Sequence, residues 1–158
     1  MVLGTLREEG ILEDTVIAFT SDHGDMLGDH GFWAKTLMYE ESARVPLLIL
    51  PREGDARFKQ GVIDDRLAAL QDIPATLLDL AGLPVPEYMD GRPFWGDQKA
   101  PPREYIYAAR DRLDAQYDAS RAVRDTRFKY IRNFKPEGSA YLDVQYRTQM
   151  GIMQELLR

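Results

Sequence analysis

The chain has 158 residues, enough for one ordinary domain, and its 44% hydrophobic and 29% charged residues are typical of a globular protein rather than a disordered one. Its net charge of −6 and the lack of a lysine- or arginine-rich run argue against a nucleic-acid partner. With no cysteine, disulfides and thiolate metal sites are excluded, and no apolar run reaches the ~20 residues that a membrane-spanning helix needs.

The first expected elements are a helix and a buried strand. Residues 2–9 are predicted to form the last turns of a helix that ends at Gly10. The apolar run at 15–20 predicts a strand, and a Gly-rich loop follows it directly. Open α/β sheets place active sites at the carboxyl ends of their strands, so the loop at 21–35 is the expected functional segment.

That loop concentrates side chains that bind metals and anions. It holds both histidines of the chain, three aspartates, three glycines and a lysine. Asp22 and His23 are adjacent, and a turn at Gly24 would let the carboxylate and the imidazole converge on one ion. Lys35 would then return as a cation toward a bound anion. From the residues alone, the alternative is an Asx turn that caps a helix.

Three further elements complete the first part of the chain. Residues 38–42 predict a short helix with its glutamates on a solvated face, and 45–50 predict a second strand. Because both strand runs are nearly continuously apolar, we expect a sheet with parallel strands that is covered on both faces. A third helix is predicted to begin at Asp72 as its N-cap and to end at Gly82. It is expected to bury an apolar stripe formed by Ile73, Leu77, Leu78 and Ala81.

The pattern changes after a segment rich in proline and glycine at 84–102, which predicts an irregular connection. Residues 105–108 and 122–131 alternate between apolar and polar side chains, which predicts antiparallel strands. Asp125 and Thr126 are expected to form a hairpin turn between the last two strands. A helical region in place of these strands would show that the periodicity was misjudged.

Several stretches together resemble one known family. Residues 21–31 and Lys35 resemble the second metal-binding segment of the sulfatase family, within the alkaline phosphatase superfamily. The stretches 44–49, 72–82, 90–93 and 121–132 resemble the family as well, so the resemblance covers nearly the whole chain. It implies an α/β fold: the carboxyl-terminal part of an alkaline-phosphatase-like sheet-and-helix layer, followed by a small antiparallel sheet. We expect residues 1–95 to be the latter part of the catalytic domain and 96–158 to begin the carboxyl-terminal subdomain.

The resemblance also implies roles for four residues. Asp22 and His23 would be ligands of a divalent metal, with Ca²⁺ as the expected ion and Mn²⁺ as the alternative. Lys35 would be catalytic through its contact with the sulfate group. His30 would contact the leaving group or orient Lys35, and its alternative role is a hydrogen bond from the ring to the backbone that stabilises the loop.

The nucleophile of the family is expected to be missing. Sulfatases of this kind use a formylglycine made from a Cys or Ser in a Cys/Ser-x-Pro/Ala-x-Arg motif upstream of the metal segment. The chain has no cysteine, and Ser120 to Arg124 matches only formally, because this stretch is downstream and predicts a strand. With 21 residues before Asp22 and no leader sequence, we interpret the chain as an internal or carboxyl-terminal piece of a sulfatase that is inactive alone.

The resemblance predicts a sulfate ester as substrate of the parent enzyme, with a sulfated carbohydrate as its carrier. A phosphonate or phosphodiester hydrolase of the same superfamily is the first alternative, and a non-catalytic module that binds an anion or a partner protein is the second. A sheet cut out of a larger one would expose strand edges, so self-association is expected. The compartment is left open, with export of the parent to the periplasm or medium as one alternative.

Overall fold

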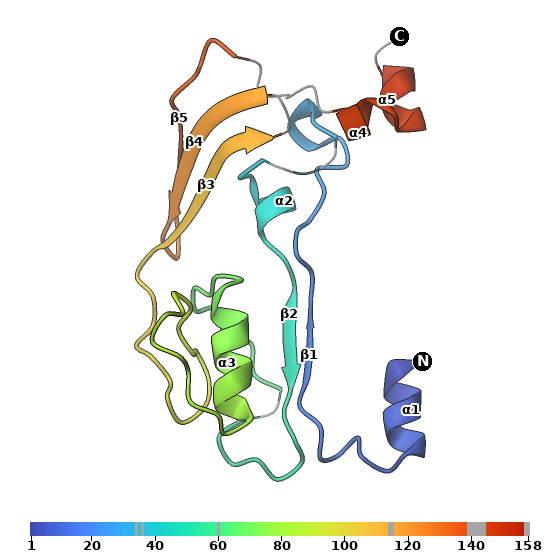
Figure 1. The fold of residues 1–158 in the computed structure, drawn as a ribbon, viewed down its shortest axis with the longest axis vertical. Helices are drawn as coiled ribbons and strands as arrows, with labels where there is room; N and C mark the ends of the chain where they lie inside the picture. Colours follow the sequence, from blue (N-terminus) through green and yellow to red (C-terminus); the bar gives the residue numbers. More distant parts are fainter. Residues whose placement is uncertain (34, 36, 60, 114–115, 139–144, 157–158) are drawn as a thin grey trace. The chain divides into compact units, whose positions relative to one another are not determined.

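The computed structural model describes residues 1–33, 35, 37–59, 61–113, 116–138 and 145–156, which form two compact units (Figure 1). The first unit consists of Met1–Gly24 and Arg44–Glu104, and the second of Asp25–Ala43 and Tyr105–Arg158. Each unit is therefore built from two separate stretches of sequence. No helix in the described ranges is long and apolar enough to cross a bilayer.

The first unit begins with helix α1, Val2–Glu8, which ends as the sequence predicts. Gly10 has a φ of 71°, and its N–H donates to the Arg7 carbonyl at 3.1 Å. The next N–H, that of Ile11, donates to the Leu6 carbonyl at 3.0 Å. Glycine takes this left-handed conformation without the steric cost that a side chain would add, so it stops the helix here.

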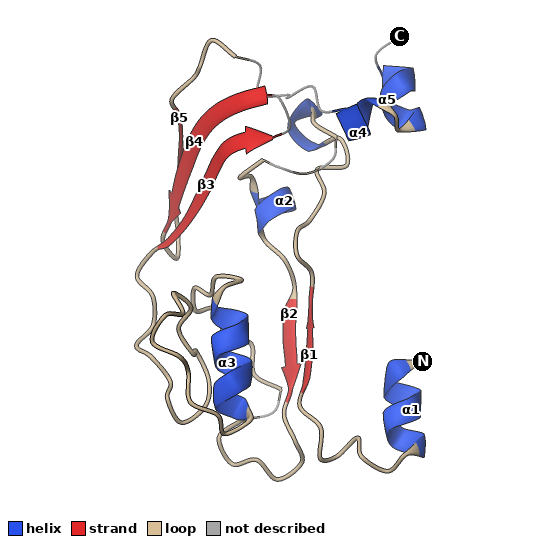
Figure 2. Cartoon of the chain, in the orientation of Figure 1, coloured by secondary structure: helices blue, strands red, loops and turns tan. Residues whose placement is uncertain are grey.

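The two apolar runs form strands β1, Ile17–Thr20, and β2, Leu47–Leu50, which pair antiparallel (Figure 2). The expectation of parallel strands is wrong for this pair. The chain leaves β1 at its carboxyl end and re-enters β2 beside that end, with Thr20 opposite Leu47, so β2 must run back. The apolar runs are also less covered than expected, since the side chains of Phe19, Leu48 and Leu50 are exposed.

Helix α3, Asp72–Leu80, lies within the predicted range, but it buries a different face. The expected stripe is only partly covered, and Leu77 is 40% exposed. The helix buries five residues, of which three are polar: the polar residues are Asp72, Thr76 and Asp79, and the apolar ones are Ala75 and Leu80. The helix buries these polar groups because the irregular segment 91–103 packs on them and supplies hydrogen-bond donors.

Asp72 is the first residue of α3 and not its N-cap as predicted, because the N-cap residue is Gln71. Its side chain instead joins three parts of the first unit. Its carboxylate accepts N–H groups from Ala69 at 2.9 Å and Arg92 at 2.8 Å. The guanidinium of Arg103 binds both oxygens, at 2.8 Å and 2.5 Å. Burial opposes the charged form, but these hydrogen bonds outweigh it, so the pKa of Asp72 lies below its ordinary value.

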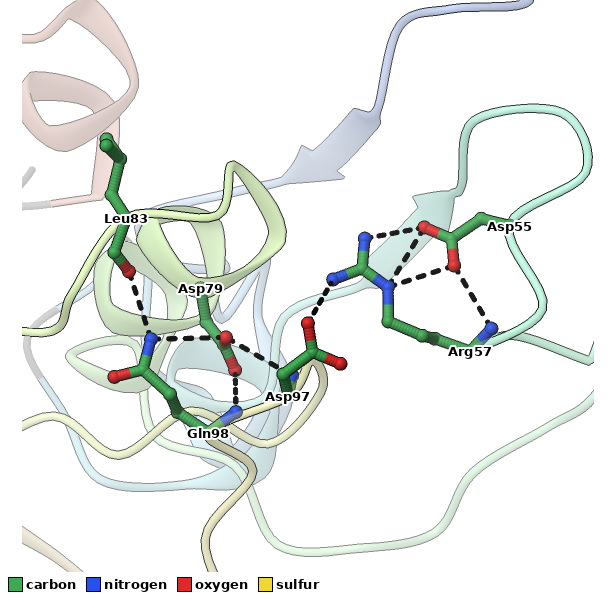
Figure 3. Close-up of polar contacts among 6 residues, drawn as sticks. All are labelled: Asp55, Arg57, Asp79, Leu83, Asp97 and Gln98. Carbon is green, nitrogen blue, oxygen red and sulfur yellow. Dashed lines mark hydrogen bonds and ion pairs between the residues drawn. The ribbon is translucent and has the colours of Figure 1, made fainter.

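Asp79 binds the same segment about two helical turns further along α3 (Figure 3). Its carboxylate accepts the backbone N–H groups of Asp97 at 3.2 Å and Gln98 at 2.8 Å. The side-chain amide of Gln98 donates to Asp79 and to the Leu83 carbonyl, at 3.3 Å and 3.0 Å. An ion pair between Arg57 and Asp97, at 3.4 Å, also links the exposed loop around Arg57 to the segment that binds Asp79.

Two glycines let the segment approach α3 so closely. A Cβ at Gly91 would lie 1.9 Å from the Gln71 carbonyl oxygen, and a Cβ at Gly96 would lie 2.2 Å from Asp79 Oδ2. Gly96 also has a φ of 109°, which side chains rarely allow. The Pro- and Gly-rich connection is therefore irregular, as expected, and it is held by hydrogen bonds.

The second unit contains the predicted antiparallel sheet, in the order β3-β4-β5 (Figure 1). Its strands are Ile106–Leu113, Gln116–Arg124 and Lys129–Asn133. The predicted hairpin turn is confirmed, since the N–H of Asp125 donates to the Phe128 carbonyl at 2.9 Å. The short helices of this unit are α2 at Glu40–Ala43, α4 at Gln145–Thr148 and α5 at Gly151–Leu156. The division at 95/96 into family subdomains stays a prediction.

Candidate functional site

Asp22 and His23 follow β1 directly and belong to the first unit. His23 Nε2 lies 3.6 Å from Asp22 Oδ2, and the His23 backbone N–H donates to Asp22 Oδ1 at 3.0 Å. The Asp22 side chain is 85% exposed and that of His23 37%. The two side chains thus point toward one another, which a shared ligand position requires.

The imidazole of His23 is oriented by the backbone next to it. Its Nδ1 lies 2.8 Å from the Gly24 carbonyl, which accepts only, so this nitrogen carries the ring proton. The Ser21 hydroxyl in turn donates to the His23 carbonyl at 2.7 Å. A neutral ring protonated at Nδ1 has its lone pair on Nε2, the nitrogen that faces Asp22.

The rest of the loop, from Asp25 onward, belongs to the second unit together with the segment that continues to Ala43. Met26 is fully buried and anchors its start. The Gly28 N–H donates to the Phe32 carbonyl at 2.8 Å, which closes a tight turn around the short 3₁₀ helix at Asp29–Gly31. A Cβ on Gly28 would lie 3.4 Å from the Trp33 ring, so Trp33 packs against this turn.

His30 sits in this turn with a φ of 54°, a conformation that costs a non-glycine residue about 1 kcal/mol. Its ring stacks on Tyr39, with 4.7 Å between centroids, and its Nε2 lies 3.9 Å from Glu41 Oε2. The side chain remains 55% exposed. The contacts of His30 are thus with a side-chain ring and a carboxylate; its predicted catalytic role stays a prediction.

Lys35 is half-buried and belongs to the same unit as His30, while its neighbours at 34 and 36 lie outside the described residues. The structure therefore brings Asp22 and His23 together in one unit and describes His30 and Lys35 in the other. The four predicted roles stay predictions.

One interaction of the segment that follows Lys35 in the sequence contradicts an expectation. Glu40, expected on a solvated face, forms ion pairs with Lys129 and Arg124 of the sheet. Lys129 Nζ also donates to the Met38 carbonyl at 2.8 Å. These partners are far apart in sequence, and nothing in the local pattern indicates them.

Ser120 lies on strand β4, as expected for the stretch that matches the nucleophile motif only formally. It is 5% exposed on β4, and its hydroxyl donates to Asp118 Oδ2 at 3.2 Å. Asp118 is also bound by Arg110 of the neighbouring strand β3. Ser120 therefore helps to satisfy a buried ion pair.

Residues 1–83, slightly more than half of the chain, match the family model for sulfatases. The chain belongs to the sulfatase family. It is 43% identical over 158 residues to an ulvan-active sulfatase of Formosa agariphila, covering 99% of this chain but 25% of that protein. This sulfatase chain thus spans about a quarter of that relative's length.

Solved structures show the same fold. BT4656, determined in complex with its substrate D-glucosamine-2-N,6-O-disulfate, has a TM-score of 0.64 and 28% identity over 85% of this chain and 28% of its own. A phosphonate monoester hydrolase from Silicibacter pomeroyi has a TM-score of 0.69 and 27% identity over 87% and 32%. The sulfatase chain therefore has the α/β fold of the alkaline phosphatase superfamily, including the small antiparallel sheet.

The family implies a metal, and the donors after β1 fit one in part. A carboxylate and an imidazole nitrogen face each other there, but the described residues include no cluster of three or more His, Cys, Asp or Glu that could hold an ion. A hard cation such as Ca²⁺ prefers six to eight oxygen ligands. Asp22 and His23 can therefore supply only part of a coordination shell.

Proposed function

We propose that this chain is the part of a sulfatase that contributes two metal ligands and the sulfate-contacting lysine, and that the whole enzyme hydrolyses sulfate esters. Asp22 and His23 would hold the cation, which is Ca²⁺, with Mn²⁺ as the alternative. When bound, the cation supplies positive charge that polarises the sulfate oxygens. The observation that carries the proposal is the approach of His23 Nε2 to Asp22 at the carboxyl end of β1.

The roles of the side chains follow from their charges. The bond from His23 Nδ1 to the Gly24 carbonyl holds the ring in the tautomer that can ligate through Nε2. Lys35 would donate to a sulfate oxygen and offset the negative charge that grows on the leaving group and sulfate in the transition state. His30 would contact the leaving group or orient Lys35.

The substrate of the whole enzyme is proposed to be a sulfated carbohydrate. Two of the relatives are named for such chemistry, one as ulvan-active and one bound to a disulfated glucosamine. The phosphonate hydrolase among the structural neighbours supports the first alternative, a phosphonate or phosphodiester hydrolase. A non-catalytic module, which binds an anion or partner without metal, is the second.

Metal titration tests the first step. Asp22→Asn keeps the size of the side chain and removes its charge. Asp14→Asn is the matched control, since Asp14 is an exposed aspartate that precedes β1 in the sequence. We expect Ca²⁺ and Mn²⁺ binding, measured by calorimetry, to weaken at least about tenfold in Asp22→Asn alone, because even the loss of an outer-shell partner typically lowers metal affinity about 10–100-fold. Equal binding in both variants would refute the metal assignment and favour the non-catalytic module.

Activity separates the remaining alternatives. The longest natural form of the protein is assayed on an aryl sulfate and an aryl phosphonate side by side. Sulfate turnover that Lys35→Ala lowers by about a hundredfold or more supports the proposal. Faster turnover of the phosphonate would favour the other hydrolase. We expect the 158-residue chain alone to be inactive, because the formylglycine that forms the covalent intermediate in the family has no precursor in it.

A further inference from the structure

Two cations of the antiparallel sheet bind one carboxylate of the loop that carries His30 and Lys35. Arg124 on β4 and Lys129 on β5 are direct partners in the strand register, so their side chains lie next to each other on one face. Arg124 Nε is 3.4 Å from Glu40 Oε1, and Lys129 Nζ forms a close ion pair with the same oxygen. All three residues belong to the second unit.

This contact is more than a surface ion pair. The Lys129 side chain is only 17% exposed, and its ammonium also donates to the Met38 carbonyl at 2.8 Å. Burial opposes the charged form of Glu40, but the hydrogen bond and charge of Lys129 and the charge of Arg124 outweigh it, so its pKa is lowered. Partly buried, hydrogen-bonded pairs are screened less by salt than exposed ones and hold their geometry better.

The segment held by Lys129 supports the turn around His30. Tyr39 lies between Met38 and Glu40, and its ring stacks on His30 and, at 6.4 Å, on Phe32. Glu41 is the residue whose carboxylate lies 3.9 Å from His30 Nε2. Lys35 therefore lies in the sequence between two residues that are held by contacts. Phe32 before it stacks on Tyr39, and Met38 after it accepts a hydrogen bond from Lys129.

We propose that Lys129 and Arg124 are positioning residues for the Lys35 loop, acting through Glu40 and the Met38 carbonyl. This proposal rests on the proposed function of Lys35, because positioning matters only if Lys35 meets a substrate. Lys129 and Arg124 would not touch the substrate themselves. They restrict the positions that the Lys35 ammonium can occupy, and small displacements of a catalytic group lower a rate severely.

Hydrogen exchange tests the structural half of the proposal in the 158-residue chain. The reporters are the amides of Ser42 and Ala43, which are bonded to the Tyr39 carbonyl. In Lys129→Met we expect them to exchange at least about tenfold faster, while amides within β3 and β4 change less than about twofold. Lys129→Arg restores the charge and should restore slow exchange. Lys135→Met is the matched control, since Lys135 lies over the Tyr117 ring instead.

Two outcomes would overturn this half. Unchanged loop amides in Lys129→Met would show that the contact does not hold the loop, and equal acceleration of loop and sheet would show general destabilisation. If Lys129→Met does not fold, Glu40→Gln is measured in its place, because it keeps both cations and the Met38 bond. In this variant too, the amides of Ser42 and Ala43 should exchange faster than those of β3 and β4, and equal acceleration of both groups would overturn this half of the proposal.

A double-mutant cycle tests the functional half in the longest natural form of the protein, with an aryl sulfate as substrate. We expect Lys129→Met to lower kcat by about tenfold with a smaller change in KM, and to have little further effect when Lys35 is already alanine. Additive effects would overturn the proposal, because Lys129 would then act independently of Lys35. No loss in Lys35→Ala itself would refute the proposed function, while the exchange result would still stand.

Discussion

The aspartates of α3 and the aspartate after β1 have opposite surroundings. Asp72 and Asp79 are each 1% exposed, and each accepts several hydrogen bonds from the segment that packs on the helix. Asp22 is largely exposed, and its contacts come from the residue next to it. A carboxylate whose lone pairs are all used by the fold stabilises the fold, whereas one that keeps its solvent-facing oxygens can bind a ligand.

The largest expected effect is at Asp72. Asp72→Asn keeps the volume but leaves the buried guanidinium of Arg103 without its counter-charge, which typically costs about 3 kcal/mol. We expect the free energy of unfolding to fall by that amount in urea denaturation. Asp97→Asn is the control, because its pair with Arg57 is exposed and should be worth less than about 1 kcal/mol. Equal losses would show that the buried carboxylate stabilises the fold no more than the exposed one.

Gly96→Ala should have the next largest effect on the same region. The new Cβ would overlap the Asp79 carboxylate and would force an alanine into a φ of 109°. Strain and displacement of this kind cost about 2 kcal/mol. Gly54→Ala shares the positive φ but has open space around it, so its loss should be smaller. A loss at Gly54 as large as at Gly96 would mean that the backbone conformation, not the contact with Asp79, matters.

The pH dependence reports the charge of Asp72 directly. Because its pKa is lowered in the folded state, its stabilising contribution is present above its unfolded pKa, near 4, and is lost as pH falls through the folded value. The stability difference between the original chain and Asp72→Asn should therefore be constant near pH 7 and shrink below about pH 4. A difference that stays constant down to pH 2 would assign the effect to packing rather than charge.

Asp22→Asn should change stability least, by less than about 0.5 kcal/mol, because its side chain is mostly in solvent. Its effect should appear only when metal is present. Added Ca²⁺ is expected to raise the melting temperature of the original chain and not that of the variant. A large loss without metal would show that Asp22 stabilises the fold as Asp72 and Asp79 do.

The contrast also explains which features the sequence could predict. Helix α3 was predictable because apolar spacing and Gly82 mark it, but its buried face was not. Asp72, Thr76 and Asp79 can be buried because residues 18 or more positions away supply hydrogen bonds to them. Local periodicity contains no information on such distant partners.

The same distinction applies to the strands and the site. Alternation correctly predicted β4 and β5, whereas the apolar run of β2 did not reveal that it runs antiparallel to β1. At the site, the approach of Asp22 and His23 was expected from a turn at Gly24 and from the family resemblance, while their metal-binding role stays a prediction. The ion pair between Glu40 and Lys129 was not predictable, because its partners are far apart in the sequence. The hydrogen bond from Lys129 to the Met38 carbonyl, in the same cluster, spans 91 positions.

The interleaving of the two units has a consequence for synthesis on the ribosome. The first unit's strand β1 is translated before the loop at Asp25–Ala43, yet the sheet that this loop belongs with begins at Tyr105. At ordinary translation rates of 5–20 residues per second, Lys129 is made roughly 4–18 seconds after Glu40. During this interval Glu40 has no cation from β4 or β5 beside it. The segment with Lys35 can therefore reach its final geometry only after most of the chain has been made.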